Sequence, residues 1–115
     1  MSASTYNFTI EQGATFLMTI TWDDEAGDPI DLTDYTAALE IRSNNRRDLI
    51  KRMTSGGGGL TMGGPAGTVV VLISNTDTAA MDFTTAVYDL ELTASGVVTR
   101  VLQGTVTLSK EVTTG

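Results

Sequence analysis

The chain has 115 residues, a net charge of −7 at pH 7 and neither cysteine nor histidine. The missing residue types remove disulfides, thiol nucleophiles, the most frequent general base and the usual zinc ligand, so we expect no enzyme. The acidic balance argues against nucleic acid and anionic lipid as partners, and no apolar run is long enough to span a membrane. The first residues do not resemble a signal peptide, which predicts a soluble protein made in a cytoplasm.

The first third of the chain alternates apolar and polar residues, which is the pattern of half-buried strands. We predict strands over residues 5–10 and 15–22, separated by a turn at Glu11–Gly13, and a third strand over residues 36–42. Trp22 ends the second strand. We expect it to anchor the core or its rim, and a binding platform is the alternative.

An acidic loop is predicted between the second and third strands, over residues 23–34. It holds six of the fourteen acidic residues, namely Asp23, Asp24, Glu25, Asp28, Asp31 and Asp34. Clustered carboxylates suit a hard cation such as Ca²⁺, but their spacing does not match the EF-hand pattern. We therefore expect a solvated loop without metal or cofactor, and a cation site remains the alternative.

A basic segment follows the third strand. Five of the seven basic residues lie within it: Arg42, Arg46, Arg47, Lys51 and Arg52. A nucleic-acid surface usually interleaves aromatic residues with such a cluster, and none are present here. Such a cluster instead keeps an edge strand soluble or meets an acidic neighbour, and for the second case Arg46, Arg47 and Arg52 are our candidates for an interface. Residues 49–53 are predicted to form a strand.

The middle of the chain combines a glycine-rich loop with an apolar strand. Residues 54–67 lack the Lys-Ser/Thr pair of a phosphate-binding loop, so they predict a flexible connection with a short strand at 60–62. Residues 68–73 are apolar apart from Thr68, which is typical of a central strand covered on both faces or packed against a partner. Residues 74–83 predict a short helical turn capped by Ser74 or Asn75, with Met81 and Phe83 pointing inward.

A β-hairpin over residues 86–102 is predicted to organise the fold. A two-residue turn at Ser95-Gly96 keeps Arg100 on the solvent face, whereas a three-residue turn would bury it. The resulting register pairs Ala94 with Val97, Leu92 with Thr99, Glu91 with Arg100 and Leu90 with Val101. Gln103-Gly104 predicts a bulge or bend before a last strand that ends near Ser109, and residues 112–115 predict a loose tail.

These segments add up to seven to nine short strands without a long helix. Turn signals recur about every ten residues, which is typical of an antiparallel β-sandwich. We therefore predict an all-β, immunoglobulin-like β-sandwich that forms one domain over residues 1–115.

The order of short motifs resembles a known family. An aromatic strand with Gln12-Gly13 is followed by the Gly27–Thr33 segment, the Tyr-Thr-Ala step at 35–37 and Ile41-Arg42. Gly-Thr-Val-Val, Tyr-Asp-Leu-Glu-Leu, Ser-Gly-Val-Val-Thr-Arg and Gln-Gly-Thr-Val-Thr then follow in the same order. The chain is similar to small β-sandwich proteins of tailed phages and prophages, in particular the N-terminal domain of baseplate upper proteins.

The resemblance implies a structural role in a virion, for a protein that is made in the cytoplasm of the bacterial host. In that family the domain is an adaptor that docks a fibre or receptor-binding device on the tail, together with other virion proteins. We expect a multicopy or homo-oligomeric protein without enzymatic activity. A capsid decoration protein is the alternative within the structural class. A carbohydrate- or cation-binding module, using Trp22, Tyr6, Tyr35 and the acidic loop, is the alternative of another class.

Overall fold

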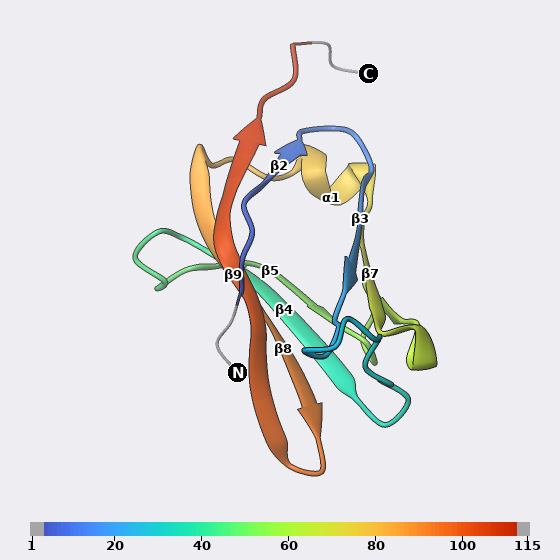
Figure 1. Ribbon diagram of the computed structural model, residues 1–115. Helices are drawn as coiled ribbons and strands as arrows, with labels where there is room; N and C mark the ends of the chain where they lie inside the picture. The colour runs from blue at the N-terminus through green and yellow to red at the C-terminus, as the bar shows by residue number, and fades with distance from the viewer. Residues whose placement is uncertain (1–3, 113–115) are drawn as a thin grey trace.

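The protein is a two-layered β-sandwich. The computed structural model describes residues 4–112, and residues 1–3 and 113–115 lie outside the description. A six-stranded sheet faces a three-stranded sheet, as Figure 1 shows, so the predicted sandwich is confirmed. We call these layers the large and the small sheet.

The strands follow the predicted segments closely, with one short helix and one 3₁₀ turn between them. Their bounds are β1 Ser4–Thr5, β2 Phe8–Glu11, β3 Phe16–Thr21, β4 Thr36–Arg42, β5 Leu49–Thr54, β6 Leu60–Met62, η1 Gly64–Ala66, β7 Thr68–Ile73, α1 Asn75–Ala79, β8 Thr85–Ala94 and β9 Val97–Ser109. The first predicted strand is divided into β1 and β2, and the last two strands are longer than predicted.

The β8–β9 hairpin forms the centre of the large sheet, whose order is β1-β9-β8-β4-β5 with β2 also on β9. The predicted pairs from the turn to Glu91–Arg100 are confirmed. The register then shifts, so that Leu90 pairs with Leu102 and not with Val101 as predicted. This bulge leaves Val101 as the extra residue, and both Val101 and Leu102 turn out to be buried, at 9% and 8% exposure.

The N-terminal strands lie along β9, and both are parallel to it. Between them the backbone of Tyr6 passes so close to Gly104 that a Cβ there would lie 2.2 Å from the Tyr6 carbonyl oxygen. The buried Tyr88 hydroxyl donates a hydrogen bond of 2.5 Å to the same carbonyl. Gly104 is therefore the point where the N-terminal segment crosses β9. The bulge of β9 lies at Val101 and not at Gln103-Gly104, where a bulge or bend was predicted.

The small sheet has the order β3-β7-β6. Its central strand, β7, buries Val69, Val71 and Ile73 against the large sheet. Leu72 points the other way and is 49% exposed. Within the described chain, the strand is therefore covered on one face only. Of the two predicted possibilities, packing of its outer face against a partner remains.

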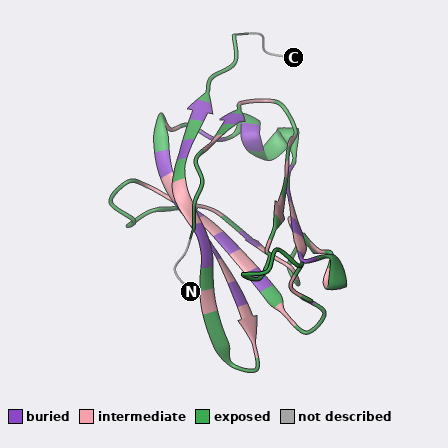
Figure 2. Ribbon diagram, in the orientation of Figure 1, coloured by how far each residue is buried: buried purple, intermediate pink, exposed green. Residues whose placement is uncertain are grey.

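Buried residues of the strands form a core between the two sheets (Figure 2). This core is almost entirely apolar. Leu39, Leu90 and Val71 are fully enclosed. The exception is Thr78 of α1, whose hydroxyl donates to the Ala14 carbonyl at 2.8 Å and accepts from the Gly13 amide at 3.1 Å. The helix, capped by Ser74 as predicted, therefore fixes the turn between β2 and β3.

Candidate interaction site

The basic segment after β4 forms a tight turn that is held by its own side chains. The Ser43 hydroxyl donates to Asn45 Oδ1 at 2.6 Å and accepts from the Asp48 amide at 3.1 Å. Asn45 Oδ1 also accepts from the Arg47 amide at 3.0 Å. Arg46 lies at the bend with a φ of 63°, a left-handed conformation that is rare for a residue with a long side chain.

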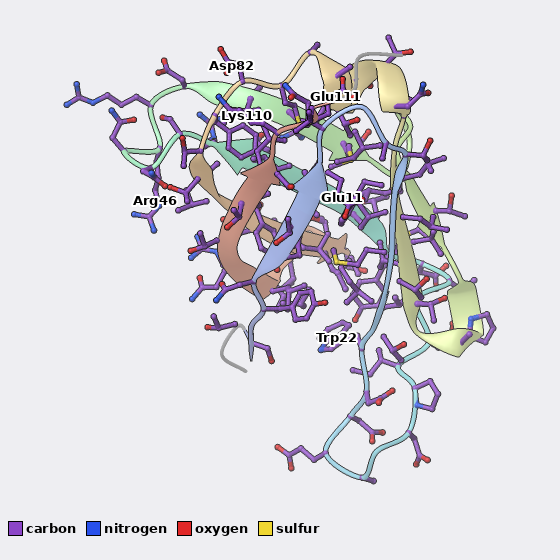
Figure 3. All side chains as sticks on the ribbon, turned by 90° about the horizontal axis from the view of Figure 1, so that it is seen from above. Glu11, Trp22, Arg46, Asp82, Lys110 and Glu111 are labelled. Carbon is purple, nitrogen blue, oxygen red and sulfur yellow. The ribbon has the colours of Figure 1, made fainter. Side chains whose placement is uncertain are left out.

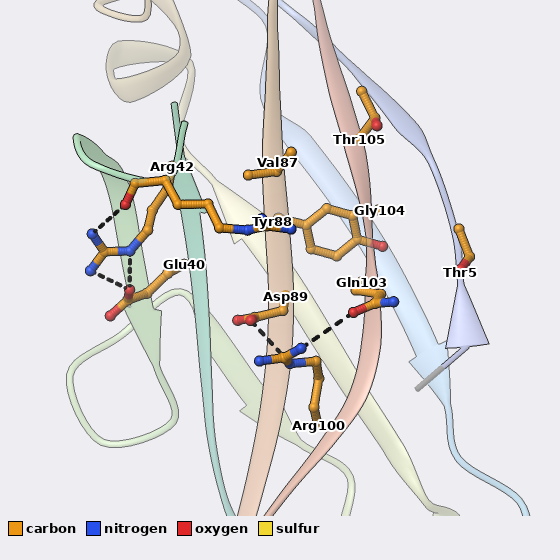
Figure 4. A pocket seen from close by; sticks show the side chains of 11 residues that line it. Thr5, Glu40, Arg42, Val87, Tyr88, Asp89, Arg100, Gln103, Gly104 and Thr105 are labelled. Carbon is orange, nitrogen blue, oxygen red and sulfur yellow. Dashed lines mark hydrogen bonds and ion pairs between the residues drawn. The ribbon is translucent and has the colours of Figure 1, made fainter. Parts of the chain in front are cut away.

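A hollow of about 730 Å³ lies beside this turn, on the outer face of the large sheet. Residues of strands β1, β4, β8 and β9 line it (Figure 4). Arg46 of the turn also lines it. Its lining residues are Thr5, Glu40, Arg42, Arg46, Val87, Tyr88, Asp89, Arg100, Gln103, Gly104 and Thr105. We call it the arginine hollow.

Two carboxylates lie directly opposite each other among the lining residues of the hollow. Glu40 on β4 pairs in register with Asp89 on β8. Like charges at such positions repel, and arginines offset the repulsion on both sides. Arg42 Nη2 lies 2.8 Å from Glu40 Oε1, Arg52 forms an ion pair with the same carboxylate, and Arg100 Nε lies 3.2 Å from Asp89 Oδ2.

The electrostatics of Glu40 follow from this arrangement. Partial burial raises the pKa of its carboxyl, but hydrogen bonds from Arg42 and Arg52 and the charges of both more than offset that effect. The pKa of Glu40 therefore lies below its ordinary value, and the carboxylate is ionised at neutral pH. The hollow thus contains fixed ion pairs that orient its guanidinium groups.

The three arginines proposed from the sequence differ in their position relative to the hollow. Arg46 lines the hollow, and Arg52 lies next to it through its ion pair with Glu40. Arg47 is exposed on the same turn but does not line the hollow. The sequence reasoning missed Arg100, which the β4–β8–β9 pairing brings to the same place. Its predicted neighbour Glu91 does pair with it in register, but its ion pair is with Asp89.

The acidic loop has a defined internal geometry. Asp24 Oδ1 accepts hydrogen bonds from the backbone amides of Ala26 at 2.9 Å and Asp28 at 3.0 Å. Asp31 Oδ1 accepts from the Thr33 amide and hydroxyl, and these bonds lower the pKa of the Asp31 carboxyl. Within residues 4–112, no group of three or more acidic side chains is placed to hold a metal ion. The six carboxyl-bearing residues all lie in exposed positions.

Two apolar surfaces face solvent elsewhere. On the small sheet, Leu17 of β3 and Leu72 of β7 are cross-strand partners with exposures of 66% and 49%. At the tip of the β8–β9 hairpin, which projects beyond the sheets in Figure 1, Val97 and Val98 are 65% and 58% exposed. Both surfaces could bury apolar area against another protein.

The aromatic residues considered for carbohydrate binding do not form one cluster. Trp22 and Tyr35 meet edge to face at 5.9 Å, and both pack against the core. Tyr6 stacks on Phe8 at 6.4 Å, and Phe8 in turn contacts Phe16 and Tyr88. These rings therefore belong mainly to the packing of the sandwich.

The chain was compared with protein-family models and with the sequences of curated proteins. No protein-family model matches it, and no curated protein matches its sequence. Within the described part of the chain, no helix is long and apolar enough to cross a membrane.

Proposed function

We propose that this protein is a structural component of a phage virion, an adaptor in the tail or baseplate that docks a fibre or receptor-binding device. The order of motifs along the chain supports this role, because it resembles the N-terminal domain of baseplate upper proteins. An adaptor acts through surfaces that bind neighbouring proteins and needs no reactive groups.

The observation that carries the proposal is the outer face of the small sheet, where two exposed leucines lie among threonines and uncharged neighbours. Leu17 and Leu72 lie side by side on it with Val70 next to them, and the outward positions of β3 and β7 carry no charged residue. Apolar surface of this kind is stabilised when another protein covers it. We assign it to the contact with the neighbouring virion protein.

The first test is mass spectrometry of purified particles of the phage or prophage that encodes the chain. About six to a few dozen copies per particle is the outcome expected for a tail ring, since closed rings follow point-group symmetry. Hundreds of copies would favour the alternative, a capsid decoration protein. The absence of the chain from the particles would overturn both.

A paired substitution locates the contact. Leu17→Ser with Leu72→Ser removes the apolar pair, and we expect incorporation into particles to fall at least about tenfold. Leu49→Ser is the matched control, since Leu49 is also 49% exposed but lies on β5 at the edge of the large sheet. If the control and the double variant are incorporated equally, the small sheet is not the docking face.

A further inference from the structure

The arginine hollow and the acidic loop have complementary charges, and they belong to the same chain. We propose that copies of this protein associate head to tail, with the 23–34 loop of one copy seated in the arginine hollow of the next. This inference concerns only copies of the chain, and it holds or fails independently of the virion role.

The hollow has unused hydrogen-bonding capacity for carboxylates. The Arg46 guanidinium forms no hydrogen bond or ion pair with any side chain in residues 4–112. Arg100 uses Nε for Asp89 and Nη1 for a 3.5 Å contact with Gln103, which leaves further N–H groups of its five free. The guanidinium groups of Arg46 and Arg100 can thus each bind a carboxylate through two parallel N–H···O hydrogen bonds at the hollow.

The local charge of the hollow is opposite in sign to that of the whole protein. Arg42, Arg46 and Arg100 line it against Glu40 and Asp89, which leaves an excess of one positive charge. Arg47 and Arg52 lie next to the hollow, and so do Asp48 and Glu91, so these four charges leave the excess unchanged. Since the chain carries −7 overall, the remaining surface is more acidic still, and the 23–34 loop is its most concentrated negative segment.

The loop is suited to be the occupant. Glu25 lies in a turn closed by the hydrogen bonds of Asp24, and its carboxylate, like that of Asp28, forms no ion pair with a described residue. Both are exposed. A loop that is already ordered loses little conformational entropy on binding, which favours association.

The contact has to be between molecules. Figure 3 shows Arg46 on one side of the body and the segment that follows Trp22, which leads into the acidic loop, on another. In the head-to-tail arrangement each copy gives its loop to one neighbour and its hollow to another, so the contact is heterologous, repeats from copy to copy and gives a ring or an open filament.

Repulsion between two acidic bodies does not prevent this contact at physiological salt. The protein measures 44 × 28 × 25 Å. The screening length is about 8 Å at 0.15 M ionic strength, so most charges on the two bodies are screened from each other, whereas guanidinium–carboxylate pairs in contact are much less so. At 1 M salt, where the screening length is about 3 Å, we expect the association to weaken.

Sedimentation velocity of the purified full chain tests the proposal, using two variants that remove charge without reversing it. The hollow variant is Arg46→Gln with Arg100→Gln, and the loop variant is Glu25→Gln with Asp28→Asn. The wild type should show species larger than a dimer as its concentration rises. Each variant alone should self-associate at least about 100-fold more weakly than the wild type and should sediment as a monomer. Lys110→Glu, an exposed site beyond β9, is the control and should behave as the wild type.

The mixture of the two variants is decisive. The hollow variant still has an intact loop, and the loop variant still has an intact hollow, so an equimolar mixture should form dimers and stop there. A monomeric wild type up to about millimolar concentration, the Kd at which binding is only about 4 kcal/mol, would overturn the proposal. A wild type that stops at the dimer, or a mixture that stays monomeric, would overturn it as well. Circular dichroism establishes that each variant is folded.

Discussion

The outer faces of the two sheets differ in chemistry although both arise from the same alternation of side chains. The outer face of the large sheet carries crossing ion pairs of Glu40, Asp89 and their arginines around a hollow. The outer face of the small sheet carries threonines together with Leu17 and Leu72. A charged face binds partners in a salt-dependent way, whereas an apolar face binds by burying area. One small sandwich thus offers two kinds of contact.

The largest expected effect comes from comparing the same substitution, leucine to alanine, at a core position and at an exposed position. Leu90→Ala on the inner face of the large sheet removes a fully buried side chain, and we expect the free energy of unfolding to fall by about 2–5 kcal/mol. Leu72→Ala on the outer face of the small sheet should change it by less than about 0.5 kcal/mol. Urea denaturation of both variants measures the difference. Equal losses would mean that the outer face of the small sheet is covered.

The second-largest loss of stability is expected where the N-terminal segment crosses β9. Gly104→Ala adds a Cβ that has to displace the Tyr6 carbonyl, so we expect a loss of about 1–3 kcal/mol and partial detachment of β1. Gly56→Ala is the matched control, because a Cβ there meets no atom within 4 Å and Gly56 does not have a positive φ. Hydrogen exchange at β1 and β2 reports the detachment. An unchanged exchange rate in the Gly104 variant would contradict the assigned role of this glycine.

The fold was largely predictable because its strands are encoded by local alternation. The hairpin turn followed from Ser95-Gly96, and the pairing near it followed from keeping Arg100 out of the core. The shift at Val101 did not follow, because its cause lies in the large sheet, where two successive residues of β9 are buried. The parallel pairing of β1 and β2 with β9 joins the two ends of the chain, and no local signal indicates it.

The candidate interaction site was predictable only in part, for the same reason. Arg46 and Arg52 stood out because they are close together in the sequence. Arg100 lies far along the chain, and it reaches the hollow only because β8 pairs with β4 and β9 pairs with β8. The like-charged pair of Glu40 and Asp89 likewise depends on that register. A sequence pattern identifies a cluster within one segment, whereas strand order determines which distant residues complete it.

The smallest expected effect tests whether the ion pairs of the hollow stabilise the large sheet. Because the pKa of Glu40 is lower in the folded protein than its ordinary value of 4.5, the unfolded state takes up a proton first as the pH falls. The stabilisation by Glu40 is therefore fully present above pH 4.5 and is lost as the pH falls through the lower folded-state pKa. Above pH 4.5, Glu40→Gln should reduce the free energy of unfolding by about 1 kcal/mol at most, since the site is partly exposed.

The pH dependence distinguishes this electrostatic loss from a change in packing. Below the folded-state pKa the wild-type carboxyl is protonated and resembles the glutamine, so the two unfolding energies should converge. A difference that persists at low pH would assign the loss to packing. Glu91→Gln is the control on the same face, because the Glu91 carboxylate forms no ion pair with a described residue. We expect its unfolding energy to stay within about 0.5 kcal/mol of the wild type at neutral pH.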